Sequence, residues 1–497
     1  MSSFKEVSAT EINEVMERSL IAFQEYKRIS SDDKALFLET IATEIEALGD
    51  ALIEHASVET NLPAARLQGE RGRTTGQLRM FANMLREGSW VEASIDTAVP
   101  DKNPPKPDIR KLLIALGPVV VFGASNFPFA YSTAGGDTAS ALAAGCSVVV
   151  KAHPAHATTS QIVYEAIQKA IAKTKMPASI FQHVHGSSFE SGKALVQHEA
   201  TAAVGFTGSF TGGKALYDYA AARKNPIPVF SEMGSINPVL LLPDSLENNA
   251  ASLAKQYVAS ITLGMGQFCT NPGLLIAVES EGLNAFIETL GNEIEKVIPA
   301  NMLHAGIHAA YNKKMHDALT QKGVALIKQS SNKTENLQTL PTIAKVKGEI
   351  FLHNSILHEE VFGPYSLMVG CKDMDELIAV WKSARGQLTT SLMGTDKDFA
   401  DHPLLLQTAE SIAGRIVFNN VPTGVEVCPS MVHGGPFPAS TDSRFTAVGI
   451  NAVKRWVRPV CYQNCPQQLL PVELKNDNPK KIWRLLNNEW TKDKAEC

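Results

Sequence analysis

The sequence predicts an α/β protein whose first half is a doubly wound parallel sheet. Short valine-rich runs at 118–122 and 147–151 are typical of strands that are buried on both faces. Further strands are expected at 179–184, 202–206 and 238–242, and helices near 159–174, 188–198 and 209–223. Strands and helices that alternate at this spacing form βαβ units, which predicts a parallel sheet with helices on both faces.

The length indicates more than one packed unit. A single hydrophobic core rarely grows beyond about 250–300 residues, and this chain has 497. A second α/β region is expected from about 245 to 445. Residues 10–60 are expected to be helical, because apolar residues recur there at spacings of three and four: Leu38, Ile41, Ile45, Leu48 and Leu52. Four prolines in 100–108 predict an exposed turn before a strand.

The composition is that of an ordinary globular chain and excludes several classes of partner. The formal net charge is −5, whereas a nucleic-acid binder usually presents a basic face. No apolar segment approaches the ~20 residues needed to cross a bilayer, and the first residues lack the apolar core of a signal peptide. No nucleic acid and no membrane is therefore expected as a partner. Seven cysteines are too few for a disulfide scaffold and favour a reducing, cytoplasmic compartment.

The turn after the strand at 202–206 is the first of four segments whose residue types could carry chemistry. Gly208, Gly213 and Lys214 nearly match a P-loop, but Ala215 replaces the hydroxyl that would hold Mg²⁺, which disfavours a nucleoside triphosphatase. A glycine-rich turn at a helix N-terminus could still bind a pyrophosphate through its backbone N–H groups. The alternative is a tight turn without a ligand.

The other three segments each place one reactive side chain at a turn. Cys269 lies on an irregular segment between Gly266 and Gly273, where a reactive thiol and a buried core cysteine both remain open. Glu232 ends an apolar strand, which suits a general base as well as a solvated turn carboxylate. Asn126 follows the strand at 118–122, where its amide could stabilise an oxyanion or only shape a turn.

No metal ion is expected. The pairs His153/His156 and Cys461/Cys465 are the two candidates that the sequence offers. Each lacks a second pair at the spacing that structural zinc ligands need.

Taken together, and in order from about 110 to 460, these segments resemble the aldehyde dehydrogenase superfamily. The resemblance implies that Cys269 in GQFC is the nucleophile, Glu232 in SEMGSINP the general base and Asn126 in SNFP the oxyanion donor. It also implies a site for NADP or NAD, with these residues: Lys151, His153, Gly208, Ser209, Gly213, Glu360 and Phe362.

The chain departs from the family pattern at several places. Three residues past Lys151, where NAD-preferring members often have Glu, this chain has Pro154. A carboxylate there would repel a 2′-phosphate, so its absence predicts that NADP⁺ is used at least as well as NAD⁺. Ser235 replaces the usual second Gly of the general-base motif, and the Gly-Gly segment near the C-terminus begins with His433.

Five segments resemble one branch of the family, the α-ketoglutaric semialdehyde (2,5-dioxovalerate) dehydrogenases: ASNFPFAYSTAGGDTASALAAG, KAHPAHATTS, GQFCTNPG, PTGVEV and MVHGGPFPAS. The fatty aldehyde dehydrogenases of luminous bacteria are similar across the same segments. The resemblance implies oxidation of α-ketoglutaric semialdehyde to 2-oxoglutarate through a cysteine thiohemiacetal and thioester, with a long-chain aldehyde as the alternative substrate. A cofactor-free thiol hydrolase or esterase that uses Cys269 and Glu232 is a rival, although Lys151 and the Gly208 turn argue against it.

The aldehyde is expected to contact side chains close to the nucleophile: Phe127, Phe129, Tyr131, Phe268 and His433. The aromatic side chains suit a fatty chain and a short keto-acid equally. A keto-acid would also need an arginine for its carboxylate, and Arg110 and Arg444 are the candidates.

The resemblance implies a Rossmann-type cofactor domain, an α/β catalytic domain and a strand-exchanging oligomerisation arm, and hence a homodimer or homotetramer. The expected bounds are 1–96 and 118–240 for the cofactor domain, 241–445 for the catalytic domain, and 97–117 and 446–463 for the arm. The tail at 464–497 is left without a predicted structure.

Overall fold

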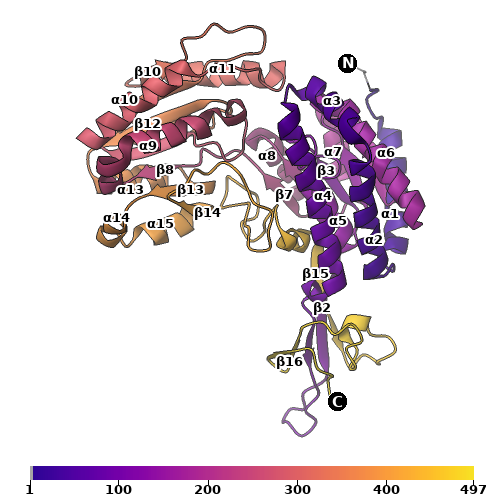
Figure 1. Ribbon diagram of the computed structural model, residues 1–497. Helices are drawn as coiled ribbons and strands as arrows, with labels where there is room; N and C mark the ends of the chain where they lie inside the picture. Colours follow the sequence, from indigo (N-terminus) through magenta and orange to yellow (C-terminus); the bar gives the residue numbers. More distant parts are fainter. Residues whose placement is uncertain (1–3, 497) are drawn as a thin grey trace.

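The computed structural model describes residues 4–496 and contains three sheets, two of which are flanked by helices (Figure 1). The first sheet has the strand order β5-β4-β3-β6-β7 and is parallel throughout. Its strands are β3 (Val119–Phe122), β4 (Val148–Lys151), β5 (Phe181–Val184), β6 (Ala203–Thr207) and β7 (Val229–Glu232). The four strands expected between residues 118 and 206 are thus confirmed.

The order of these strands decides where a ligand can bind. The chain runs from β3 to β5 on one side and from β6 to β7 on the other, so the switch point lies between β3 and β6, where Phe122 pairs with Phe206. The loops that follow β3 and β6 therefore open side by side at the carboxyl edge of the sheet, which is the usual place for a ligand. The helices of this unit are α5 (Gly136–Ala144), α6 (Ala157–Thr174), α7 (Phe189–Gln197) and α8 (Phe210–Ala221). The last three confirm the helices expected from the sequence, whereas α5 is not among those expectations.

Four helices precede the first sheet: α1 (Ala9–Tyr26), α2 (Ser31–Glu46), α3 (Gly49–Thr60) and α4 (Ala64–Glu87). The apolar stripe that we predict from the sequence is divided between α2 and α3, because the chain turns at Gly49, whose φ is +61°. Leu38, Ile41 and Leu52 are nevertheless all buried in the same core, which these helices share with α5 and α6.

The second sheet has the order β10-β11-β12-β9-β8-β13-β14, and only β10 is antiparallel to its neighbour. Its strands are β8 (Val239–Leu241), β9 (Leu274–Val278), β10 (Ala325–Gln329), β11 (Thr342–Lys347), β12 (Tyr365–Cys371), β13 (Gln387–Met393) and β14 (Ala413–Phe418). Its helices are α9 (Pro243–Thr262), α10 (Glu281–Lys296), α11 (Ala305–Leu319), α12 (Gly348–His353), α13 (Met374–Ser383), α14 (Asp396–Asp401) and α15 (Leu405–Ile412). No helix within residues 4–496 is both long and apolar enough to cross a membrane.

The boundary that we expect at residue 240 is wrong, because it would divide β8. The chain leaves the first sheet after Glu232 and enters the second at Val239. An apolar run shows that a strand is buried but not which sheet it joins, so the pattern at 238–242 could not settle its place. After β14 the chain returns toward the first unit, where Ala439 accepts a hydrogen bond from the Met233 N–H at 2.8 Å.

A third sheet, the arm, extends away from the other two (Figure 1). Its order is β15-β2-β1-β16-β17, with β1 (Ser94–Asp96), β2 (Ile109–Ala115), β15 (Val457–Gln463), β16 (Arg484–Leu486) and β17 (Glu489–Thr491). The tail thus supplies two strands that no sequence pattern predicts. Residues 450–456, which we expect in the arm, instead form a 3₁₀ helix whose Ala452, Val453 and Trp456 pack in the core of the first unit.

Replacement of Trp456 tests whether residues 450–456 pack in the core of the first unit. Its ring is fully buried, packs edge-on against Phe230 at 5.3 Å between centroids, and donates from Nε1 to Ser140 Oγ at 2.8 Å. We expect Trp456→Ala to reduce the free energy of unfolding by about 3–5 kcal/mol, which lowers the melting temperature of a chain of this length by about 3–5 °C. Phe189→Ala is the control, because Phe189 is 86% exposed. Equal melting temperatures for the two variants would contradict the packing described.

Candidate active site

A cavity of about 450 Å³ opens at the carboxyl edge of the first sheet. The loops after β3, β6 and β7 form one wall, and the second unit contributes the other through α11, the Cys269 segment and residues 360–362. Asn126, Gly208, Glu232 and Cys269 all line this cavity, so the four segments singled out in the sequence meet in one place. A concave site with convergent polar groups is the usual form of a small-molecule site.

Cys269 owes its position to an unusual backbone. It follows a segment in which Gly264, Met265 and Gly266 all have φ between +54° and +64°. A Cβ on Gly266 would lie 2.2 Å from the carbonyl oxygen of Gly363, so only glycine allows the chain to pass there. The nucleophile candidate therefore sits on a segment that its neighbours hold in a left-handed conformation.

The buried side chain of Asn237 fixes the same segment to the crossing between the two sheets. Its Nδ2 donates to the carbonyl oxygens of Cys269 at 2.8 Å and Asn271 at 2.9 Å, while its Oδ1 accepts from Ser235 and Thr389. The crossing that begins at Glu232 is thus tied directly to the segment that carries Cys269.

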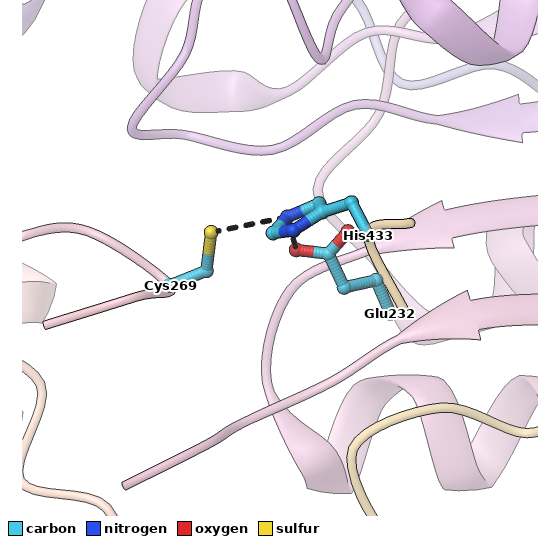
Figure 2. Close-up of side chains that lie close together, drawn as sticks. All are labelled: Glu232, Cys269 and His433. Atoms are coloured by element: carbon cyan, nitrogen blue, oxygen red, sulfur yellow. Dashed lines mark hydrogen bonds and ion pairs between the residues drawn. The ribbon is translucent and has the colours of Figure 1, made fainter. Parts of the chain in front are cut away.

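Cys269, His433 and Glu232 form a chain of contacts (Figure 2). Nε2 of His433 lies 3.5 Å from Cys269 Sγ and 3.0 Å from Glu232 Oε1. His433 and Glu232 are buried, with exposed fractions of 1% and 5%. We predict His433 as a substrate contact from the sequence, and the structure instead places it between the thiol and the carboxylate.

The hydrogen bonds of these groups place a proton on Nε2 of His433 and leave two buried atoms without a partner among residues 4–496. A carboxylate only accepts, so Nε2 of His433 is the donor to Glu232. Nδ1 of His433 and Oε2 of Glu232 are buried without a partner within residues 4–496. An unpaired carboxylate oxygen beside the thiol is well placed to accept a hydrogen bond from a water molecule.

The surroundings of Cys269 disfavour its thiolate. Burial, together with the negative charge of Glu232, raises the pKa of the Cys269 thiol well above its ordinary value, and the charge of Arg73 acts in the opposite direction. The thiolate is the nucleophile. The thiol therefore has to lose its proton to a base, or Glu232 has to move, before Cys269 can attack.

Asn126 lies within reach of the same place. Its Nδ2 donates to the Gln267 carbonyl at 3.1 Å, which leaves a second N–H on this amide, and its backbone carbonyl accepts from Arg66 at 2.7 Å. Because Gln267 precedes Cys269 by two residues, the amide is held beside the thiol, as an oxyanion donor requires.

The residues predicted to bind the cofactor fall into two groups. Five of them line the cavity: His153, Gly208, Ser209, Glu360 and Phe362. Lys151 and Gly213 are not part of its wall. Lys151 Nζ donates to the Gly186 carbonyl at 2.5 Å, at the end of β4. A Cβ on Gly213 would lie 2.7 Å from Met233 Cγ, so this glycine serves the packing of α8 on β7.

The wall fits a dinucleotide on two grounds. The N-terminus of α8, capped by Ser209, faces the cavity, and a helix N-terminus attracts phosphate. At the other end Glu360 is buried, and this burial raises its pKa to about 7. Glu360 lines the cavity, and a carboxylate there can accept hydrogen bonds from the hydroxyl groups of a ribose.

Of the aromatic residues predicted to contact the substrate, some lie at the cavity and one does not. Phe127 and Tyr131 line the cavity, and their ring centroids are 5.4 Å apart. Phe268 packs edge-on against Phe127 at 5.7 Å. Phe129 does not belong to this group, because its side chain lies in the core of the first unit, which corrects its assignment as a substrate contact.

Neither arginine that we name for a substrate carboxylate is near the site. Arg110 lies in the arm and pairs with Asp108, and Arg444 is an exposed partner of Asp442. The arginines over the aromatic rings are instead Arg66 and Arg73, and Arg415 is close enough for the charges of Cys269 and Tyr131 to act on its pKa. Arg66 and Arg73 are seven residues apart, which places them on one face of α4, and this spacing is the signal that sequence reasoning missed.

The expectation that the chain binds no metal stays a prediction. Glu232, Cys269 and His433 offer a carboxylate, a thiol and an imidazole whose ligand atoms lie within 4.8 Å of one another. This donor set also suits zinc, but the hydrogen bonds described above already account for it. The histidine pair considered in the sequence, His153 and His156, forms a ring stack with centroids 5.5 Å apart.

Proteins with similar sequences are aldehyde dehydrogenases, whose chemistry fits the groups found in this site. Residues 1–440 match the model of the aldehyde dehydrogenase family. The chain is 48% identical over 486 residues to alpha-ketoglutaric semialdehyde dehydrogenase 2 of Azospirillum brasilense, which covers 97% of this chain and 92% of that protein. It is 43% identical over 492 residues to alpha-ketoglutaric semialdehyde dehydrogenase of Acinetobacter baylyi, which covers 99% of this chain and 93% of that protein.

Solved structures show the same fold. Betaine aldehyde dehydrogenase of Staphylococcus aureus superimposes with a TM-score of 0.79 at 17% identity, over 94% of this chain and 91% of that one. A glyceraldehyde-3-phosphate dehydrogenase of Methanocaldococcus jannaschii, complexed with NADP, gives 0.77 at 19% identity, over 93% and 95%. The chain belongs to the aldehyde dehydrogenase family. It is an enzyme that oxidises an aldehyde with NAD(P).

The pKa of Cys269 gives a test. Because this pKa is raised, the thiolate fraction is small at neutral pH and grows only at alkaline pH. We expect the pH of half-maximal alkylation by iodoacetamide, followed by peptide mass spectrometry, to be higher for Cys269 than for the exposed Cys461. Glu232→Gln removes a charge that raises the pKa, so it should shift the Cys269 profile to lower pH. A Cys269 profile at or below that of Cys461 would refute this description of the thiol.

Proposed function

We propose that this aldehyde dehydrogenase oxidises α-ketoglutaric semialdehyde (2,5-dioxovalerate) to 2-oxoglutarate. The observation that carries the proposal is the near full-length identity, 48% and 43%, to two enzymes named for this substrate. The site is consistent with it, since the cavity that contains Cys269 is lined by aromatic rings and bordered by arginines.

We assign the first chemical step to Cys269 and Asn126. Once its proton has passed to a base, Cys269 attacks the aldehyde carbon as a thiolate, and a thiohemiacetal forms on Sγ. The free N–H of the Asn126 amide and the backbone N–H of Cys269 donate to the oxygen as it becomes negative. A negative oxygen pushes electrons toward the carbon, which makes the carbon a better hydride donor. The nicotinamide cofactor, when bound, supplies the hydride acceptor.

We assign the second step to Glu232 and His433. Loss of the hydride leaves a thioester on Cys269, which splits one difficult oxidation into two easier reactions. Glu232 accepts a proton from water through Oε2, the oxygen to which no group within residues 4–496 donates a hydrogen bond. His433 holds the other oxygen at 3.0 Å and so orients the carboxylate. The acid leaves, and the thiol group of Cys269 is restored.

Two variants separate the two steps. Cys269→Ala should lower turnover by about 10³-fold or more, because no covalent intermediate can form. Glu232→Gln should retain a pre-steady-state burst of reduced cofactor but little steady turnover, since hydride transfer precedes the step that needs the base. Stopped-flow absorbance of reduced nicotinamide measures both. A Glu232→Gln enzyme without a burst would place Glu232 in an earlier step.

We further propose that the enzyme uses NADP⁺ at least as well as NAD⁺. Pro154 is exposed at the start of the 3₁₀ helix Pro154–His156, next to His153 in the cavity wall, so no carboxylate stands there to repel a 2′-phosphate. Pro154→Glu should lower kcat/KM for NADP⁺ by about tenfold or more through like-charge repulsion, with little change for NAD⁺. The proposal fails if the unaltered enzyme prefers NAD⁺ more than tenfold.

We also propose that the protein forms a homodimer or homotetramer through its arm and works in the cytoplasm. β15 and β17 are the outer strands of the arm sheet, and outer strands offer unpaired backbone groups to a partner. Trp490 on β17 is 63% exposed. All six cysteines within residues 4–496 are free thiols, which suits a reducing compartment.

Initial rates with three aldehydes test the proposed substrate preference. Formation of NADPH from NADP⁺ and of NADH from NAD⁺ is measured with α-ketoglutaric semialdehyde, pentanal and a long-chain aldehyde. We expect kcat/KM to be highest for the semialdehyde by tenfold or more, about 1.4 kcal/mol of transition-state preference. A preference for the long-chain aldehyde would make the protein a fatty aldehyde dehydrogenase. Ester hydrolysis without any aldehyde oxidation would make it a thiol hydrolase.

A further inference from the structure

Three arginines near Cys269 have no role in the steps above. Arg66 and Arg73 come from α4, and Arg415 comes from β14. Each is partly buried, and each has a buried guanidinium nitrogen without a hydrogen-bond partner among residues 4–496. None of the three forms a salt bridge with another residue of this range. Buried cations are normally paired, so the group lacks an anion.

Of the three arginines, Arg73 has the weakest hydrogen bonding to the rest of the described chain. Its guanidinium lies over the ring of Tyr131 at 5.4 Å and the ring of Phe127 at 5.9 Å, and it donates only a long hydrogen bond, 3.3 Å, to Tyr131 Oη. Both rings line the cavity that contains Cys269. Stacking on two rings orients the planar guanidinium but leaves its N–H edge free, which is the edge that binds a carboxylate.

The two neighbouring arginines are more fully occupied. Arg66 donates to the Asn126 carbonyl at 2.7 Å and lies over Phe127 and Phe268. Arg415 donates to the carbonyl oxygens of Gly424 and Pro422. These contacts use one or two N–H groups of each and neutralise no charge, so Arg66 and Arg415 add positive potential around Arg73.

The acid closest in sequence does not supply the missing anion. Glu70 lies between Arg66 and Arg73 on α4, but its Oε1 accepts from the backbone N–H groups of Phe129 and Ala130 at 2.8 and 3.0 Å. Burial raises the pKa of Glu70, which reduces its negative charge further. An anion from outside the protein would therefore complete the group.

We propose that Arg73 binds the carboxylate of the aldehyde substrate and thereby selects short aldehydes that carry an acid at the far end. The inference deepens the proposed function and rests on it. In α-ketoglutaric semialdehyde four carbon–carbon bonds separate the aldehyde carbon from the carboxylate carbon, a span of about 5 Å. The ring of Tyr131, over which Arg73 lies, is 6.2 Å from the ring of His433, and Nε2 of that ring is 3.5 Å from Cys269 Sγ. With the aldehyde carbon at Sγ, the carboxylate can therefore reach toward Arg73. Binding at this point orients the aldehyde toward the thiol.

The test compares one charged and one neutral aldehyde of equal length in matched variants. Arg73→Met keeps the length of the stem but removes the charge, and Arg73→Lys keeps the charge but not the planar fork. Arg79→Met on the same helix is the control, because Arg79 pairs with Glu46 on the surface. The readout is the ratio of kcat/KM for α-ketoglutaric semialdehyde to that for pentanal. A ratio is used because the charge of Arg73 also acts on Cys269, and that effect is common to both substrates.

We expect Arg73→Met to lower this ratio about 10- to 100-fold, mainly through a higher KM for the semialdehyde. Arg73→Lys should lower it less, and Arg79→Met should leave it unchanged. The inhibition constant of 2-oxoglutarate as a competitor should rise by a similar factor in Arg73→Met, which measures carboxylate binding without any chemistry. Equal losses for both aldehydes, together with an unchanged inhibition constant, would overturn the proposal.

Failure of this proposal and failure of the proposed function give different results. If the unaltered enzyme does not prefer α-ketoglutaric semialdehyde to pentanal, the proposed function is wrong. The role of Arg73 is then decided by succinic semialdehyde, a shorter acid aldehyde, against butanal: a ratio that falls in Arg73→Met upholds carboxylate binding, and a constant ratio rejects it. If the unaltered enzyme prefers the α-ketoglutaric semialdehyde but Arg73→Met keeps that preference, only the assignment of Arg73 is wrong.

Discussion

The site depends on the short crossing between the two sheets, from Glu232 to Val239. Asn237, fully buried and with φ of +46°, ties this crossing to the Cys269 segment through two side-chain hydrogen bonds. Gln387 Oε1 on β13 accepts from the backbone N–H groups of Ile236 and Asn237. The crossing therefore has little freedom, and the carboxylate at its start is fixed relative to the thiol. Because the two groups come from different sheets, a loss of these bonds would separate them.

Charge is unevenly distributed around the Cys269 thiol. Acidic groups gather at Glu232 and Glu360, and the negative charge of each raises the pKa of Cys269. Positive groups gather instead at the aromatic rings of Phe127 and Tyr131, where Arg73 lies. An anionic aldehyde is drawn toward the arginines and repelled by the carboxylates. The same carboxylates raise the pKa of the Cys269 thiol, so the proposed selectivity and the reactivity of the thiol depend on the same charges.

Much of this architecture could be predicted from the sequence, because it rests on local patterns. Valine runs mark the strands of the first sheet, and Cys269, Glu232 and Asn126 each follow a strand or lie on an irregular segment. His433 could not be placed in this way, since it is 201 residues from the carboxylate that it contacts. The strands β16 and β17 have only three residues each, too few for a periodic pattern. The sequence does not show which face of α4 borders the site, so it does not distinguish Arg73 from Arg110 and Arg444 as a partner for a carboxylate.

In the mechanism that we propose, Cys269 carries the substrate through an acyl-enzyme stage, and Glu232 activates the water that hydrolyses it. The most direct test of this mechanism is the mass of the peptide that contains Cys269, taken from Glu232→Gln enzyme quenched in acid after mixing with NADP⁺ and α-ketoglutaric semialdehyde. We expect this peptide to gain one 2-oxoglutaryl group, and the gain to disappear when the cofactor is omitted or Cys269 is replaced by alanine. A peptide of unchanged mass, under conditions in which reduced cofactor has formed, would contradict the account.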